Sequence, residues 1–421
     1  MNAMIALAAG IGALAAGAAA EEPVYPVKVS STGRYFVDQK DRPVFWLGTT
    51  QWQLFRDNTP EEADVILANV KDKGFSFVQV MLAGVGDGTR PNAGGQKPWI
   101  NDDPLRPNEA YFRNVDAALA SARKNNVNIS LTLYHQRWRK LITESNARAW
   151  ATWLAKRYKD VPTIVWSMTP EARKEFVPVL RELAAGLKEG DGGAHLITFK
   201  PDPAPYSSSF LHEESWLAFD CMQVWKRIDL IYPMVTKDYR LKPVKPVVMA
   251  EGAYEAGTEY GFDVTPLWVR REAWYSYLCG AHHTYGHNDS WRMLPTWKKS
   301  LDAPGAVQMG ILKRVLTARG EWWALVPDQG ILAAGGNTKG NVLNLAARHA
   351  DGKWMLAYLG AKAAFSIRLD KLTAGGRATA FWIDPRTGNS TPAGSFPNKG
   401  TQPFTTPQGW EDAVLVLESS P

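Results

Sequence analysis

The sequence predicts an α/β fold, a (β/α)8 TIM barrel, followed by a small all-β sandwich domain. From Arg34 onward, short apolar and β-branched runs alternate with longer helical segments, a pattern typical of βα units around a parallel sheet. Eight such runs fall within about 245 residues, the size of this type of barrel. Beyond residue 320 the helical segments stop, and short alternating runs lie between turns rich in Gly, Pro, Asn and Asp. We therefore predict a barrel at residues 21–320 and a β-sandwich at residues 321–421.

The first unit fits this pattern closely. A short hairpin strand at Tyr35–Asp38 precedes the first barrel strand, which we expect at Pro43–Gly48. A helix follows over Pro60–Lys73, with Thr59 as its N-cap, a proline at its first position and two glutamates in its first turn. Gly74 ends this helix, because glycine adopts the left-handed backbone that terminates helices.

The later units repeat the alternation. We expect the other seven barrel strands at Phe75–Leu82, Asn128–Tyr134, Thr163–Met168, His195–Lys200, Phe219–Trp225, Pro246–Glu251 and Ala281–His287. The helices are expected at Ala110–Asn125, Ser145–Tyr158, Ala172–Lys188 and Val307–Arg319. A loop at Ala83–Asn108 is longer than most connections, and we expect it to close one side of a cleft. An open doubly wound sheet is the main alternative, but no G-x-G-x-x-G follows a strand.

The two ends of the chain differ from the barrel. Strands of the C-terminal domain are expected at Trp354–Leu359, Ala364–Leu369, Thr379–Ile383 and Ala413–Leu417. Residues 1–20 contain no charged side chain and end in three alanines, which predicts a cleaved signal peptide and export to the periplasm or the medium. No later segment is apolar for long enough to span a membrane.

Composition and motifs exclude several kinds of ligand and several kinds of catalytic site. The 48 Lys and Arg exceed the 42 Asp and Glu by six, but they are scattered, so neither a nucleic-acid nor a polybasic membrane surface is indicated. Two cysteines exclude a disulfide scaffold and a Cys-rich metal site. No P-loop, G-x-S-x-G elbow or Cys/His nucleophile pattern is present. The 18 tryptophans suit either a large core or a site that grips flat sugar rings.

Two carboxylates follow apolar barrel strands. Glu251 ends the seventh strand, and Glu171 comes shortly after the fourth. Catalytic groups of barrels lie at these strand ends, and glycosidic cleavage uses a pair of carboxylates, so we predict a glycoside hydrolase. Two structural alternatives stay open: Glu251 could pair with Arg270 or Arg271, and Glu171 could be the first acidic residue of a helix.

Other polar and aromatic residues near the strand ends are candidates for contact with a carbohydrate substrate. They are Gln51, Trp52, His135, Gln136, Trp138, Trp166, Gln223, Trp225, Lys226, Tyr254, Glu255, Tyr285, His287 and Trp291. His282, His283 and His287 invite a metal site, but alternate strand positions point apart and no familiar ligand spacing is present. We therefore expect neither a metal nor an organic cofactor, and the oligomeric state is not readable from the sequence.

Six segments carry a family pattern: Phe45–Trp52, Arg106–Phe112, Ile164–Trp166, Ala250–Glu255, Thr284–Asn288 and Val326–Gln329. On these segments the chain resembles the apiosidase-like glycoside hydrolases, which are barrels followed by a small β domain named for collagen binding. The resemblance implies a retaining mechanism with Glu251 as the nucleophile and Glu171 as the acid/base.

The chain departs from the family pattern near the expected site. The family has Asp where Glu171 stands, Gly-Gly at Thr169-Pro170, Gly-Asp-Thr at Gly48-Thr49-Thr50, His-Pro at Lys200-Pro201 and Ser-Gly-His at Val224-Trp225-Lys226. These differences imply a changed substrate, and the two lysines suggest an acidic sugar or a carboxylated neighbouring unit. Two other functions stay open: a catalytically inactive carbohydrate-binding barrel, and an adhesion protein that acts through its C-terminal domain.

Overall fold

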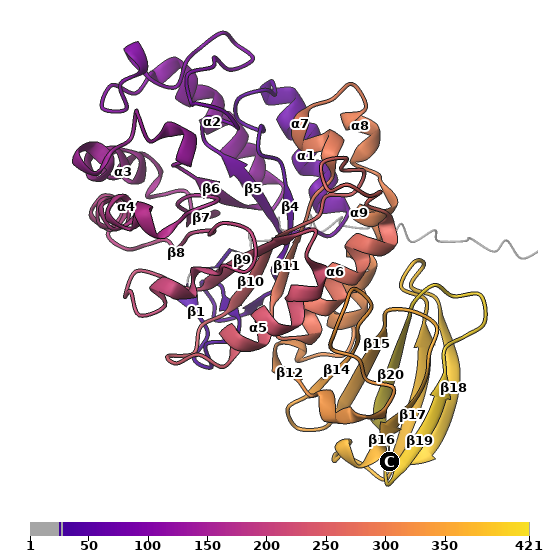
Figure 1. The fold of residues 1–421 in the computed structure, drawn as a ribbon. Helices are drawn as coiled ribbons and strands as arrows, with labels where there is room; N and C mark the ends of the chain where they lie inside the picture. The colour runs from indigo at the N-terminus through magenta and orange to yellow at the C-terminus, as the bar shows by residue number, and fades with distance from the viewer. Residues whose placement is uncertain (1–24, 27, 421) are drawn as a thin grey trace, which may run out of the picture.

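The computed structural model describes residues 25–26 and 28–420, so the predicted signal peptide at residues 1–20 lies outside the described residues. The described chain forms a barrel of eight parallel strands surrounded by helices, with antiparallel sheets beside it (Figure 1). The barrel strands are β4 (Leu47–Thr50), β5 (Phe77–Met81), β6 (Asn128–Thr132), β7 (Ile164–Ser167), β8 (Ile197–Thr198), β9 (Asp220–Trp225), β10 (Val247–Gly252) and β11 (His282–Tyr285). The predicted fold class is confirmed.

Strands β4 to β11 pair in the order β8-β7-β6-β5-β4-β11-β10-β9. The gap between β8 and β9 is bridged by single contacts. The Ala218 amide donates to the Ile197 carbonyl at 2.8 Å, and the Thr198 hydroxyl donates to the Phe219 carbonyl at 2.8 Å. The sheet is therefore nearly closed, and all eight carboxyl ends face one mouth.

An antiparallel hairpin sheet closes the opposite end of the barrel. It consists of β1 (Lys28–Val29), β2 (Phe36–Val37) and β3 (Pro43–Val44). The prediction that Pro43–Gly48 forms one barrel strand is therefore wrong: Val44 pairs with Phe36 in the hairpin, and the barrel strand begins at Leu47. The reason is burial, because Phe36 packs 5.3 Å from Trp46 and 5.0 Å from Phe219 and fills the base of the barrel.

The helices cover the outside of the barrel (Figure 1). They are α1 (Pro60–Asp72), α2 (Glu109–Lys124), α3 (Glu144–Tyr158), α4 (Val177–Asp191), α5 (Ile231–Tyr239), α6 (Pro266–Leu278), α7 (Asn288–Arg292), α8 (Trp297–Ser300) and α9 (Pro304–Thr317). The predicted helix at Ala172–Lys188 begins too early, because a 3-10 turn at Lys174–Phe176 precedes α4. Within the described chain, no helix is both long and apolar enough to cross a lipid bilayer.

The C-terminal domain consists of two antiparallel sheets. The larger has the order β12-β14-β15-β20-β17-β18, and the smaller has the order β13-β16-β19. Their strands are β12 (Leu325–Pro327), β13 (Leu332–Ala334), β14 (Asn344–His349), β15 (Trp354–Leu359), β16 (Ala364–Arg368), β17 (Arg377–Ile383), β18 (Ser390–Pro397), β19 (Thr401–Thr405) and β20 (Ala413–Ser420). The four predicted strands are present as β15, β16, β17 and β20, and the other five strands named here were not predicted.

The central strands of the larger sheet are buried on both faces. On β15, Leu356 and Tyr358 belong to the core shared with the barrel, whereas Met355 and Ala357 belong to a second core between the two sheets. Successive strand residues point to opposite faces, so a strand that is apolar at every position requires cover on both sides. Helix α6 supplies this cover, with Trp274 stacked 5.5 Å from Tyr358.

Candidate active site

Glu251 lies at the carboxyl end of β10, among strand residues that are all buried. Its carboxylate forms an ion pair with Lys200, which follows β8. Gln79 of β5 fixes this strand end, because its side-chain amide donates to the Ala250 carbonyl at 2.7 Å and to the Thr50 hydroxyl at 3.2 Å. The position of Glu251 is thus set by contacts from β5 and from the segment after β8.

Lys200 is 1 % exposed, and its ammonium group lies 4.4 Å from the centroid of the Trp52 ring. A buried charge is costly unless it is paired, and here Glu251 is the partner. The expectation that Lys200 presents positive charge to an acidic sugar is therefore corrected: its charge is neutralised within the protein. The alternative partners of Glu251 are also ruled out, since Arg270 binds Asp412 and Arg271 donates to the Gly360 carbonyl.

The pKa of Glu251 lies above its ordinary value, mainly because burial disfavours the carboxylate. The negative charge of Glu171 raises this pKa further, whereas Lys200 and a hydrogen bond from Tyr254 lower it. The two carboxylates predicted to act together are therefore near enough to influence one another. Lys200 is the group that favours the ionised form of Glu251.

Glu171 lies in the loop after β7, and its side chain is 28 % exposed. Gln136 donates to its carboxylate, and Nε2 of His135 lies 3.9 Å from the same oxygen. Its backbone has a φ of 55°, a left-handed conformation that is uncommon for residues with a side chain and is often found at functional sites. The alternative that Glu171 opens a helix is excluded, because α4 begins only at Val177.

His135 is a neutral hydrogen-bond donor beside Glu171. Its Nδ1 accepts the Arg137 amide at 3.1 Å, which places the proton of the neutral ring on Nε2. Burial, reinforced by the charges of Arg137 and Lys200, lowers its pKa to about 4. The imidazole can therefore donate toward Glu171 or a bound hydroxyl at neutral pH without adding a positive charge.

Aromatic residues from several strand ends surround these groups. The Trp52 indole donates to the Tyr254 hydroxyl at 2.9 Å, and the Trp291 ring lies 6.2 Å from Tyr254. Trp225, at the end of β9, is 37 % exposed and packs edge-on against Tyr260. The backbone of Trp225 is left-handed, with a φ of 50°, and its indole is held by Gln223 at 2.9 Å. Trp225 therefore offers a fixed, partly exposed aromatic ring next to β10.

Four more predicted residues lie at the same end of the barrel, with different surroundings. Gln51 is buried after β4, and the Gln223 amide donates to the Pro201 carbonyl. The exposed Lys226 reaches the Tyr260 carbonyl at 3.5 Å. His287 accepts the Asp289 amide through Nδ1 at 3.1 Å and so caps α7, which leaves Nε2 as its donor.

Trp138 and Trp166, both predicted to contact substrate, are instead completely buried. The Trp138 indole donates to the Gly86 carbonyl at 2.9 Å, because the loop at residues 83–108 folds over it. The Trp166 indole donates to Asp191 of α4 at 3.0 Å and therefore points outward, toward the helix layer. The structure brings neither ring to the mouth.

Glu255 and Tyr285 are also kept from the mouth. The Tyr285 hydroxyl donates to Glu255 at 2.5 Å, and the other Glu255 oxygen accepts the Gly305 amide in the first turn of α9. A carboxylate is favourable at a helix N-terminus, so this pair stabilises the packing of α9 against the barrel. Both residues are buried, and their predicted contact with substrate is not supported by these positions.

Besides Gln79, two further residues of this region were not predicted. Tyr260, in the loop after β10, accepts the Tyr254 amide at 3.1 Å. Glu272 of α6 accepts the Ala253 amide at 2.9 Å, and burial raises its pKa to about 8. No local pattern identifies either residue, because the first lies in a loop and the second lies on a helix that is buried on nearly every side.

A hollow of about 660 Å³ lies next to the loops that carry Glu171 and Lys200. Ala172 directly follows Glu171, and its amide donates to the Lys200 carbonyl at 3.1 Å; both Ala172 and Asp202 line the hollow. Tyr206, which is 56 % exposed, forms another part of its wall. The hollow thus adjoins the loop that carries Glu171 and the segment that carries Lys200, the ion-pair partner of Glu251.

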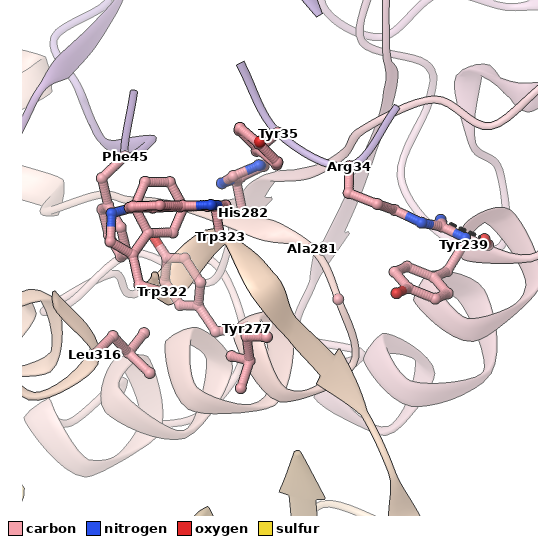
Figure 2. A pocket seen from close by; sticks show the side chains of 12 residues that line it. Arg34, Tyr35, Phe45, Tyr239, Tyr277, Ala281, His282, Leu316, Trp322 and Trp323 are labelled. Atoms are coloured by element: carbon pink, nitrogen blue, oxygen red, sulfur yellow. Dashed lines mark hydrogen bonds between the residues drawn. The ribbon is translucent and has the colours of Figure 1, made fainter. Parts of the chain in front are cut away.

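A second hollow lies at the base of the barrel and has a different character (Figure 2). It is lined mainly by the aromatic rings of Tyr35, Phe45, Tyr239, Tyr277, Trp322 and Trp323. Its volume is about 50 Å³, far smaller than that of the hollow near Glu171. Throughout the described residues, no group of three or more His, Cys, Asp or Glu side chains is arranged to hold a metal ion.

Residues 30–324 match the family model described as "Apiosidase-like, catalytic domain". The chain belongs to the apiosidase-like family. Residues 326–418 match a model described as "Putative collagen-binding domain of a collagenase". The apiosidase-like architecture therefore accounts for both parts of the described chain, and the resemblance inferred from the six sequence segments is confirmed.

Solved structures agree with this apiosidase-like assignment. One named "Glycoside hydrolase" is 24 % identical, with a TM-score of 0.86, and the alignment covers 94 % of this chain and 97 % of the other. A glycoside hydrolase family 5 protein from Bacteroides vulgatus is 25 % identical, with a TM-score of 0.86 and coverage of 94 % and 93 %. No curated protein matches the chain. The apiosidase-like chain is thus a member of a glycoside hydrolase family.

Proposed function

We propose that this protein is a retaining glycoside hydrolase in which Glu251 is the nucleophile and Glu171 is the acid/base. The observation that carries the proposal is the convergence of two carboxylates from opposite sides of the barrel at one mouth, where the charge of Glu171 raises the pKa of Glu251. Retaining enzymes need one carboxylate to attack and one to transfer protons. Family membership supports the same reaction class.

The first step forms a covalent intermediate. Glu171 gives its proton to the glycosidic oxygen while Glu251 attacks the anomeric carbon, so the carbon–oxygen bond breaks and the leaving sugar departs as an alcohol. Lys200 binds Oε2 of Glu251, which leaves Oε1 for attack. The ion pair with Lys200 lowers the pKa of Glu251 and so opposes the effect of burial, which raises it.

The second step returns the enzyme to its starting state. Glu171 removes a proton from water as the water oxygen attacks the anomeric carbon, and the bond to Glu251 breaks. The Nε2 donor of His135 and the amide of Gln136 lie beside the Glu171 carboxylate and hold it in position for both proton transfers. No other reactant is required, since one water is consumed for each bond cleaved.

The substrate that we propose is a plant or bacterial oligosaccharide or polysaccharide. Trp225 and Trp291 supply aromatic faces for sugar rings, and His287 supplies a hydroxyl-binding donor. The leaving part of the chain would enter the hollow beside Glu171, where Tyr206 is exposed. Export is part of this proposal, supported by the uncharged, alanine-rich residues 1–20 and by the external location of such polymers.

A glycan panel with stereochemical analysis tests the proposal. The purified protein is incubated with plant and bacterial oligosaccharides, and the anomeric configuration of the first product is followed by NMR. We expect cleavage with the configuration retained. An inverted product would contradict the roles assigned to Glu171 and Glu251, and binding of a glycan without cleavage would support an inactive carbohydrate-binding barrel. N-terminal sequencing of protein recovered from the periplasm and the medium tests export.

A further inference from the structure

We infer that the C-terminal β domain holds the nucleophile strand in position through helix α6. This inference rests on the proposed role of Glu251 and extends it beyond the barrel. Helix α6 lies between the barrel and the larger C-terminal sheet, where it packs against β14 and β15 (Figure 1). Arg270 and Glu272 are two positions apart on this helix, so their side chains point to opposite sides of it. Glu272 binds the barrel, and Arg270 binds the C-terminal domain.

On the barrel side, Glu272 binds the segment that follows Glu251. One carboxylate oxygen accepts the Ala253 amide at 2.9 Å and the Trp268 indole at 2.8 Å. The fit is tight at Gly252, where a Cβ would lie 2.2 Å from a Glu272 oxygen. The carboxyl group therefore contacts the chain directly after the nucleophile, and a side chain at position 252 would force the two apart.

On the other side, Arg270 binds the C-terminal domain. Its guanidinium donates two hydrogen bonds to Asp412, at 2.7 and 2.6 Å, and a third to Gln308 of α9 at 2.7 Å. Asp412 is 1 % exposed and also accepts the Tyr358 hydroxyl at 2.5 Å. A planar, two-bond ion pair of this kind fixes orientation as well as distance, so it holds α6 in one rotational setting.

The two contacts together form one continuous connection from Asp412 through α6 to the Ala253 amide. Rotation of α6 by a small angle would withdraw Glu272 from β10, because both contacts depend on the same rigid helix. Glu272 acts here as a positioning residue, since it touches the backbone beside Glu251 and not the reacting atoms. The C-terminal domain is then a part of the catalytic unit and not a separate adhesion module.

Hydrogen exchange tests this connection without any substrate. We expect Asp412→Asn to speed exchange of the Ala253 amide about tenfold in the full-length protein. The matched control is Asp328→Asn, which breaks ion pairs with Arg348 and Lys371 inside the C-terminal domain, away from α6, and should leave Ala253 unchanged. If Asp412→Asn fails to fold, Tyr358→Phe removes only one hydrogen bond to Asp412 and should give a smaller increase. Unchanged Ala253 exchange in the folded variant would overturn the inference.

Kinetics add a second test. Glu272→Ala should lower kcat about tenfold at constant KM, and Glu272→Gln, which still offers an oxygen acceptor, should restore most of it. The losses from Glu272→Ala and Asp412→Asn should not add, although distant sites without shared partners usually do add. Additive losses, or a loss confined to KM, would overturn the inference. If no glycan is cleaved, the proposed function fails. The exchange measurement still tests whether the C-terminal domain holds the segment after Glu251 through α6.

Discussion

The two ends of the barrel differ in the kind of side chain that they bury: apolar at the base and ionisable at the mouth. The base is filled by apolar and aromatic side chains such as Phe36 and Trp46, which gain free energy from burial. The mouth holds Lys200, Glu251 and His135, all of them buried, and burial disfavours the ionised forms of Glu251 and His135. Buried ionisable groups with shifted pKa values at a barrel mouth are typical of functional sites, so the mouth should carry the activity of the protein and the base its stability.

The largest expected effect is loss of turnover at the mouth. Glu251→Gln and Glu171→Gln should each reduce kcat/KM by about 10³-fold or more, because each removes a covalent or proton-transfer step. Steady-state rates on the best glycan of the panel measure this. Glu171→Gln should recover when the leaving group needs no protonation, as with an activated aryl glycoside, whereas Glu251→Gln should not. Equal recovery of both variants would contradict the assigned roles.

The base should show the reverse behaviour. Phe36→Ala removes a fully buried ring and should lower the free energy of unfolding by about 3–5 kcal/mol, while the folded protein keeps its kcat. Urea denaturation and rates measured well below the transition check this. Val65→Ala, at a position 51 % exposed, is the control and should change stability by about 0.5 kcal/mol or less. A fall in kcat for Phe36→Ala would break the division between base and mouth.

The ion pair at the mouth predicts a shift in pH dependence. Lys200 lowers the pKa of Glu251, so Lys200→Met should raise that pKa further above its ordinary value. Glu251 must be ionised to attack, so the low-pH limb of the kcat/KM profile should move toward higher pH. As the pH falls, the Lys200→Met variant should therefore lose activity at a higher pH than the unmodified protein does. Lys226→Met, at an exposed lysine, should leave this limb unchanged, and a shift toward lower pH would contradict the role of Lys200.

Smaller effects are expected at the aromatic walls. Trp225→Ala should raise KM about tenfold, equivalent to about 1.4 kcal/mol, because it removes an exposed ring beside β10. Trp225→Phe should retain most of the affinity. Similar losses for both variants would show that the indole hydrogen bond to Gln223 matters more than the ring face.

The smallest effect concerns the hollow beside Glu171. Tyr206→Ala should raise KM a few-fold for long oligosaccharides and leave the shortest cleavable substrate unaffected. A series of substrates of increasing length measures this. An equal effect at every length would exclude the hollow as the site of the leaving group.

The carboxylates at the mouth could be predicted from local sequence, whereas their surroundings could not. Glu251 directly ends an apolar run, and the order of strands in a barrel then brings it to the same mouth as Glu171. Trp138 and Trp166 also follow or end strands, yet the loop at residues 83–108 covers the first and α4 holds the second. Proximity to a strand end does not reveal which way a ring points.

Alternation of apolar and helical runs, with its caps and glycines, was sufficient to predict most of the barrel's strands and helices, because these elements depend on neighbours within a few residues. The pairing of Lys200 with Glu251, the pairing of Glu255 with Tyr285 and the link from Asp412 through Arg270 to α6 depend on the packed chain. Each joins residues between 30 and 142 positions apart. Such long-range pairings produce no periodic pattern in the sequence, since the paired residues become buried and adjacent only when the elements pack together.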